Sequence, residues 1–271
     1  MQQKKSQTQL KTFSGEFNKF LDLLRRKENF AFSRFSDGEL FVLQNKEVIL
    51  ADDYYVTGDI QGAGKYTKEE HKHFDPKAHS FYREKLQEAF TFKKDNYFKG
   101  ISGRVDVGDE DFKWQLDLHG NTDEEHLTFA NVFINNNYPR FMGELVPLLS
   151  NRKVIFVLNE AADITQLPFD VEKTFRVGSN CMVNNFDMVE TICDYIKKNS
   201  IEDHIILCSA ASLSNYIIHK AYETSDKNTY LDIGSSLNPF MNLEGWKYSR
   251  GYLQHHWLGM INQYGTKVDI W

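Results

Sequence analysis

Short apolar runs alternate with helix-like segments throughout the second half of the chain. Runs of this kind, bounded by polar residues, are typical of buried strands, and they lie at 153–158, 174–177, 204–208 and 229–233. The segments 185–198 and 212–222 carry apolar residues at helical spacing, as at Val189, Ile192 and Ile196. Strict alternation of strand and helix favours βαβ units and a parallel sheet. The sequence therefore predicts an α/β fold with a Rossmann-like, mostly parallel sheet flanked by helices.

The first half of the chain is less regular. Its apolar spacing predicts helices at 13–27, 77–90 and 138–149, and a helix that begins within 39–44. Strands are expected at 30–35, 98–102 and 127–134. No Pro-rich linker or internal repeat divides the chain. We expect a polar tail at 1–12 and a single domain at 13–271, with subregions 13–150 and 151–271.

Composition narrows the partners. The net charge of -6 provides no overall basic field for nucleic acid, so none is expected as a partner. The cysteines at 181, 193 and 208 are odd in number and lack CxxC spacing, which favours a reducing compartment. No apolar run approaches the ~20 residues that span a bilayer. We therefore expect a soluble, cytoplasmic protein without a membrane span.

Two carboxylates flank a glycine directly after the first predicted strand, at Asp37, Gly38 and Glu39. Hard cations such as Mn²⁺ and Mg²⁺ prefer oxygen ligands, commonly one or two carboxylates plus substrate phosphates. Gly38 lets the backbone turn so that both acids can face one ion, and Arg34 lies close enough in sequence to bind the same phosphates. The alternative is an ordinary turn in which an acid caps the next helix.

Four segments together resemble the GT-D type glycosyltransferases, a family of bacterial surface-glycan and glycoprotein glucosyltransferases with an Asp-X-Glu metal motif. The segments are RFSDGEL at 34–40, VGSNCMVNNFDMVETICDYI at 177–196, IILCSAASLSNYIIHKA at 205–221 and YLDIG at 230–234. Their order and spacing cover roughly residues 30–245. Two loops depart from the family: residues 209–212 replace its usual Gly-Pro-Thr, and residues 235–238 replace its His-Ile-Asp pattern.

The resemblance implies a single catalytic domain that transfers a hexose, expected to be glucose, from a UDP-sugar to a hydroxyl of a glycan or glycoprotein. It implies Mn²⁺ or Mg²⁺ bound by Asp37 and Glu39. Arg34 and the loop that contains Ser209 and Ser212 would then assist at the diphosphate. The departure at 209–212 leaves the ligand contact of that loop open, and the departure at 235–238 suggests a different donor sugar or acceptor.

Other polar residues follow predicted strands, where ligands of open α/β sheets bind. Asn185, with Asn180 and Asn184, is a candidate for ribose or sugar hydroxyls or for helix capping. Asp232 lies on an apolar strand, so it is either a structural hydrogen-bonding group or a site residue that binds the nucleotide-sugar donor.

For the group that activates the acceptor, Asp117 and His119 are candidates, because they would share one face of a possible strand. Residues 106–111 are expected to form a solvated acidic loop. Residues 58–66 fail the P-loop pattern and are expected to form a flexible Gly-rich loop. The histidines at 71 and 73 are expected in an exposed loop.

Two other functions stay open. The chain can be a non-catalytic module that binds a nucleotide-sugar or a glycan. It can also be another Rossmann-type transferase such as a methyltransferase, although no GxGxxG-like loop follows the first predicted strand. The oligomeric state is not predicted.

Overall fold

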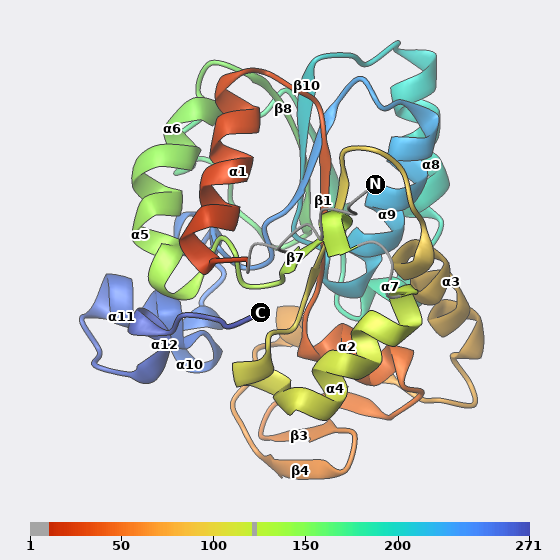
Figure 1. The fold of residues 1–271 in the computed structure, drawn as a ribbon, viewed down its shortest axis with the longest axis vertical. Helices are drawn as coiled ribbons and strands as arrows, with labels where there is room; N and C mark the ends of the chain where they lie inside the picture. Colours follow the sequence, from red (N-terminus) through yellow and green to blue (C-terminus); the bar gives the residue numbers. More distant parts are fainter. Residues whose placement is uncertain (1–10, 121–123) are drawn as a thin grey trace, which may run out of the picture.

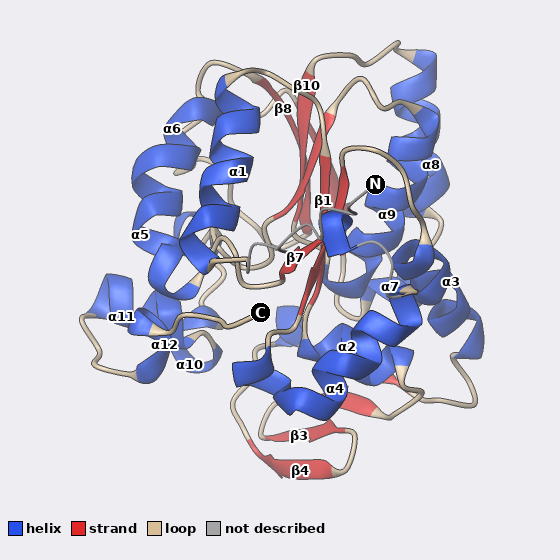
Figure 2. Ribbon diagram, in the orientation of Figure 1, coloured by secondary structure: helices blue, strands red, loops and turns tan. Residues whose placement is uncertain are grey.

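A parallel sheet of seven strands forms the centre of the computed structural model, which describes residues 11–120 and 124–271 (Figures 1 and 2). The predicted tail at 1–12 lies mostly outside these residues. Every pairing among the described strands of this sheet is parallel, which confirms the predicted α/β class. In order across the sheet the strands are β7 (Leu127–Phe129), β6 (Tyr97–Ile101), β1 (Ala31–Phe35), β11 (Thr229–Asp232), β10 (His204–Cys208), β8 (Lys153–Asn159) and β9 (Lys173–Val177).

Helices cover both faces of this sheet (Figure 1). One face packs against α1 (Phe13–Arg25) and against a helix that runs through α5 (Tyr138–Arg140), a π-turn (Phe141–Leu145) and α6 (Val146–Leu149). The other face packs against α2 (Asp37–Leu43), α3 (Ser80–Thr91), α8 (Met188–Lys198) and α9 (Ala211–Thr224).

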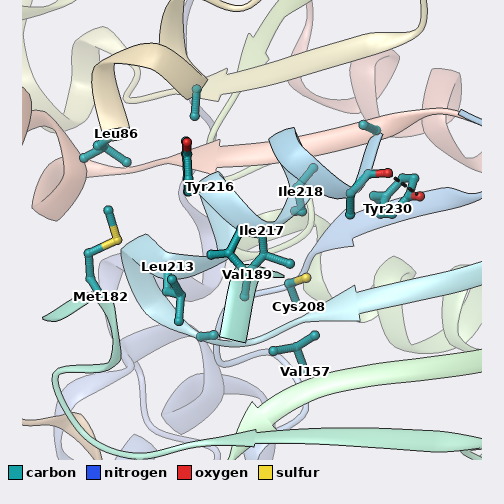
Figure 3. Packing of buried hydrophobic residues seen from close by; sticks show 14 of the residues in the cluster. Leu86, Val157, Met182, Val189, Cys208, Leu213, Tyr216, Ile217, Ile218 and Tyr230 are labelled. Atoms are coloured by element: carbon teal, nitrogen blue, oxygen red, sulfur yellow. Dashed lines mark hydrogen bonds between the residues drawn. The ribbon is translucent and has the colours of Figure 1, made fainter. Parts of the chain in front are cut away.

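Alternate strand residues supply the two cores. Val157 and Cys208 face α8 and α9, where Leu213 and Ile217 pack among them (Figure 3). Phe156, the residue before Val157, points to the opposite face of the sheet and packs in the core that includes α1.

A second, smaller sheet lies between α2 and α3 in the chain and was not predicted. It is antiparallel in the order β4 (Ile60–Ala63), β3 (Tyr54–Thr57), β2 (Val48–Leu50) and β5 (Lys72–Phe74). The strands are short and mostly half-exposed, so they leave little periodic signal. The prediction of a flexible loop at 58–66 was wrong in part, because Ile60–Ala63 form β4 and pair with β3. Gly58, with φ +65°, and Asp59 form the turn of this hairpin.

The interpretation of residues 106–119 was wrong. They belong to α4 (Arg104–His119), which is kinked at Gly108, and not to an acidic loop and a strand. Phe112, Gln115 and His119 are buried at helical spacing, whereas the alternation in residues 115–120 suggested a strand. On this helix Asp117 and His119 do not share a face.

The predicted strand at 127–134 is also too long, since only Leu127–Phe129 pairs in the sheet. The apolar residues that follow pack against helices: the Phe133 ring contacts those of Phe17, Phe20 and Phe141. Their hydrophobicity reflects burial and not strand pairing.

The remaining elements are short. The helices α7 (Cys181–Asn184), α10 (Trp246–Ser249), α11 (Gly251–Leu258) and α12 (Gln263–Thr266) and the 3-10 turns Lys68–Glu70, Glu124–His126, Asn135–Asn137 and Asn238–Phe240 complete them. The three cysteines are free thiols. Within the described ranges, no helix combines the length and apolarity that crossing a bilayer requires.

Phe20 is the centre of the core beneath α1, where its ring contacts those of Phe30, Phe32, Phe98 and Phe133. Phe20→Ala should lower the free energy of unfolding by about 3–5 kcal/mol, because it leaves a large cavity. Phe81→Ala, at a ring that is 48% exposed, is the matched control and should cost about 0.5 kcal/mol. Urea unfolding of both variants measures the difference, and equal losses would contradict this account of the core.

Candidate functional site

One large cavity of about 820 Å³ lies at the carboxyl edge of the parallel sheet. Each of the seven strands contributes at least one residue to the lining of the cavity, from its carboxyl end or from the loop that follows. These residues are Ser36, Ser102, Asn131, Asn159, Gly178, Ser209 and Gly234. The small sheet contributes Leu50 and Tyr55, and the C-terminal segment contributes Arg250 and Lys267. Ligands of open α/β sheets bind at this edge, so we place the functional site here.

A second hollow of about 470 Å³ lies between α8 and α9 and is lined in part by Phe186, Cys193 and Tyr216. It contains none of the residues that the sequence predicted for the site. The larger cavity contains Arg34, Asp37, Glu39, Ser209, Ser212 and Asp232. The chemistry therefore favours the larger cavity.

Glu39 is buried at the first turn of α2 and is fully hydrogen-bonded. Its Oε2 accepts from the backbone N–H and the Oγ of Ser36, at 3.2 and 2.7 Å. Its Oε1 accepts from Lys72 Nζ at 3.2 Å and from Ser212 Oγ at 2.7 Å. Burial alone would raise the pKa of Glu39, but the Lys72 ammonium and the Ser212 and Ser36 hydrogen bonds lower that pKa to about 2. The side chain is therefore a carboxylate at any ordinary pH.

Asp37 and Glu39 do not fit the predicted two-carboxylate metal site in this arrangement. They are the first and third residues of α2, so the helix turns their side chains about 200° apart. Asp37 is exposed and Glu39 is 6% exposed, although both border the cavity. A cation at Glu39 would have to displace the Lys72 ammonium, and the described residues contain no group of three His, Cys, Asp or Glu side chains suited to a metal. Asp37 alone is available as a carboxylate ligand of the predicted pair.

Arg34 and Asp232 come from the central strands β1 and β11, which pair side by side. Arg34 is held by neutral groups: its Nε donates to the Ala130 carbonyl at 3.0 Å and its Nη2 to Asn131 Oδ1 at 3.5 Å. Asp232 is 5% exposed, and burial raises its pKa to about 7 against the opposing charge of Arg34. The cavity thus holds a guanidinium that pairs with no carboxylate of the described residues, and an acid whose pKa is raised to about 7.

The serine and asparagine predictions have mixed outcomes. Ser209 and Ser212 border the cavity at the start of α9, and Ser212 is buried against Glu39. Asn185 does not border the cavity, and its Oδ1 accepts from the Gly178 N–H at 2.9 Å. Asn180 borders the cavity and accepts from the His73 N–H at 3.1 Å, which ties β5 to the loop after β9. The structure therefore gives Asn185 a contact that fixes the loop at Gly178, a residue that lines the cavity, while Asn185 itself does not line it.

Asp117 and His119 lie outside the cavity. The Asp117 carboxylate is 43% exposed and accepts from Lys113 one helical turn away. The His119 ring is buried beside Phe90, with their centroids 5.9 Å apart. Neither side chain is positioned to activate an acceptor in the cavity.

Two contributors to the cavity were not predicted from the sequence. Lys72 stands between the two histidines of a segment that was interpreted as a loop, and its place on β5 was not visible without the small sheet. The second is a cluster in which Asn131 Nδ2 donates to Asp106 Oδ2 at 2.7 Å and to Asp269 Oδ2 at 3.0 Å, while Lys267 pairs with Asp106. Burial and the neighbouring Asp106 raise the pKa of Asp269. This cluster combines residues from three distant parts of the sequence, so no local motif in the sequence indicates it.

No protein-family model matches the chain, and no curated protein matches it. Two solved structures are similar to it. One is a selenomethionine-substituted structure of domain of unknown function 1792 (DUF1792), with 12% sequence identity and a TM-score of 0.46. The other is this domain, stated to have a distinct glycosyltransferase fold, with 13% identity and a TM-score of 0.47. Each match covers 80% of this chain and 76% of the other.

At these identities and TM-scores, neither match says what this chain binds or transfers.

Glu39→Gln should lower the free energy of unfolding at pH 7 by about 3 kcal/mol, because it leaves the Lys72 ammonium buried without its counter-charge. The folded-state pKa of Glu39 is about 2, below its ordinary value of 4.5. Its stabilising contribution is therefore present above pH 4.5 and is lost as the pH falls towards 2.

The difference in the free energy of unfolding between wild type and Glu39→Gln, measured by urea unfolding, should therefore decrease as the pH falls from 4.5 towards 2. Glu190→Gln, at an exposed position of α8, is the control and should leave stability unchanged at both ends of the window. A gap that stays constant from pH 7 to pH 3 would show that the charge of Glu39 does not stabilise the fold.

Proposed function

We propose that the chain is a glycosyltransferase that moves a hexose from a nucleoside-diphosphate sugar to a hydroxyl of a glycan or glycoprotein. The observation that carries the proposal is the convergence of Arg34, Lys72 and the buried Asp232 in one cavity at the carboxyl edge of the sheet. Cationic side chains bind and stabilise a leaving diphosphate. A carboxylate whose pKa is near 7 can accept the proton of an attacking hydroxyl. In line with the sequence resemblance, the proposed donor is a UDP-hexose.

The walls of the cavity support a nucleoside diphosphate as ligand. Aromatic side chains line them at Tyr55, Tyr66, Tyr252 and Tyr264, and such rings offer stacking faces for a base or a sugar. The first residues of α9, Ala211 and Ser212, add backbone N–H groups at a helix N-terminus, which favour an anion. The N–H groups of Ser209 and Ala210 do not contribute, because they donate to the Val157 carbonyl and to Ser214 Oγ. Arg34 can donate two hydrogen bonds to one phosphate group.

In the proposed reaction the acceptor oxygen forms a bond to the anomeric carbon, and the bond from that carbon to the phosphate oxygen breaks. The electron pair leaves on the nucleoside diphosphate, whose negative charge Arg34 and Lys72 stabilise. The proton of the acceptor hydroxyl passes to the carboxylate of Asp232. Asp232 is buried and has a pKa raised to about 7, so it is unprotonated and strongly basic for a carboxylate above that pH.

The Mn²⁺ or Mg²⁺ that the sequence resemblance implies stays a prediction. Glu39 is committed to Lys72, Ser212 and Ser36, so it does not fit as a direct ligand, whereas Asp37 is exposed at the cavity. No step of the proposed reaction depends on the ion.

Release of the nucleotide separates this function from the alternatives. Purified protein is incubated with UDP-glucose, UDP-galactose or GDP-mannose and candidate glycan acceptors, and free nucleotide is measured. We expect one UDP-hexose to give release that rises with acceptor concentration. Donor binding without release would indicate a binding module, and stabilisation by S-adenosylmethionine alone would indicate a methyltransferase.

Asp232→Asn should lower kcat by about 10²–10⁴-fold, because the amide cannot take the acceptor proton. In the wild type, kcat/KM should rise with pH through about 7, since the carboxyl is protonated below that pH. The variant should lack this rise while its affinity for UDP stays unchanged.

Asp194→Asn, at a half-exposed acid on α8, is the control and should keep the wild-type pH profile. The sequence hypothesis that Asp232 binds the donor makes the opposite prediction, which is weaker UDP binding with an unaltered pH profile. That result would remove Asp232 from the proton transfer.

A further inference from the structure

Lys72 joins three parts of the fold at the cavity. It leaves β5 of the small sheet, and its Nζ lies 3.2 Å from Glu39 Oε1 on α2 and 2.7 Å from Ser212 Oγ on α9. Ser212 Oγ in turn donates to Glu39 Oε1 at 2.7 Å, which closes a triangle of polar groups. The Lys72 and Glu39 side chains are 14% and 8% exposed, and both border the cavity. The three groups thus form a well-defined, nearly buried site, in which the Lys72 ammonium is accessible to a ligand in the cavity.

The ammonium occupies the side of Glu39 on which a divalent ion would bind. Glu39 accepts four hydrogen bonds, two on each oxygen. A metal ion could therefore bind to a carboxylate oxygen only if one of these hydrogen bonds were lost. The carboxylate is therefore a positioning residue: it fixes the Lys72 ammonium and does not itself bind an added cation.

An ammonium group has three N–H donors, and Glu39 and Ser212 take two of them. The third is left for a ligand in the cavity. Lysine is a common phosphate-binding residue, and it acts there as a compact point charge. Arg34, on β1 of the large sheet, borders the same cavity and has neutral hydrogen-bond partners, so the two side chains can hold one diphosphate between them.

We propose that the Lys72 ammonium is the resident cation of this site, and that it receives the diphosphate of the donor in place of the divalent ion that an Asp-X-Glu motif implies. The inference rests on the proposed function and specifies how the diphosphate is recognised. Glu39 and Ser212 hold the ammonium in place, and Arg34 supplies the second positive charge. Binding and release of UDP then proceed without added metal.

The first test needs no variant. UDP and inorganic pyrophosphate are titrated calorimetrically into metal-stripped wild-type protein in EDTA, and again with Mn²⁺ or Mg²⁺. The affinity for each probe should agree within about threefold among the three conditions, since a change of 1.4 kcal/mol would already be tenfold. Transfer rates measured under the same conditions should also agree.

The second test removes the ammonium. Lys72→Met keeps the length of the side chain and should weaken binding of UDP in EDTA by at least about tenfold, the loss expected for a charge-assisted hydrogen bond. Lys72→Arg should recover part of the affinity. Lys198→Met, at an exposed lysine of α8, is the matched control and should bind UDP like the wild type. Circular dichroism and thermal melts establish that each variant is folded.

The outcomes separate this inference from the proposed function. If EDTA abolishes binding and transfer in the wild type and Mn²⁺ restores both, the metal prediction is right and Lys72 is not the resident cation, although the glycosyl transfer stands. If UDP binds in EDTA and depends on Lys72 but no donor releases nucleotide, the cation assignment stands and the transferase proposal fails. If neither UDP nor pyrophosphate binds under any condition, both are overturned.

Discussion

The ion pair between Glu39 and Lys72 is the interaction on which the site depends. It joins the first turn of α2 to the small sheet, and Ser212 extends it to α9. A buried carboxylate and a buried ammonium each need the other, because the loss of either leaves an uncompensated charge at low dielectric. The same pair fixes one wall of the cavity and sets the charge that a ligand meets there. Architecture and recognition therefore share one contact.

The large sheet was predictable because β8, β10 and β11 are buried on both faces. Such strands are continuous apolar runs, and the runs at 153–158, 204–208 and 229–233 carry that signal without help from neighbours. The small sheet gives no comparable signal, since its strands have three or four residues and one side open. Residues 115–120 misled for a related reason: over six residues, alternation cannot be told from one face of a helix.

The site was predictable only where it follows the sheet. Arg34, Glu39, Ser212 and Asp232 lie at carboxyl ends of strands, so a correct strand assignment brings them together. Lys72 and Asp106 reach the cavity from the small sheet and from α4, whose positions no local pattern gives. The sequence also left open whether Glu39 binds a metal or caps a helix. The structure shows that it caps α2 and in addition pairs with a lysine that lies 33 positions away.

The small sheet is an excursion from the main body. The chain leaves at the end of α2 and returns at α3, and these two helices contact each other. A segment whose two ends lie close together can be replaced, lengthened or shortened without a change in the path of the core strands. Because Tyr55 belongs to it, such an exchange would change the shape of the cavity, whereas the position of Lys72 must be kept so that Glu39 retains its partner. The fold thereby separates the part that must stay constant from the part through which ligand preference can evolve.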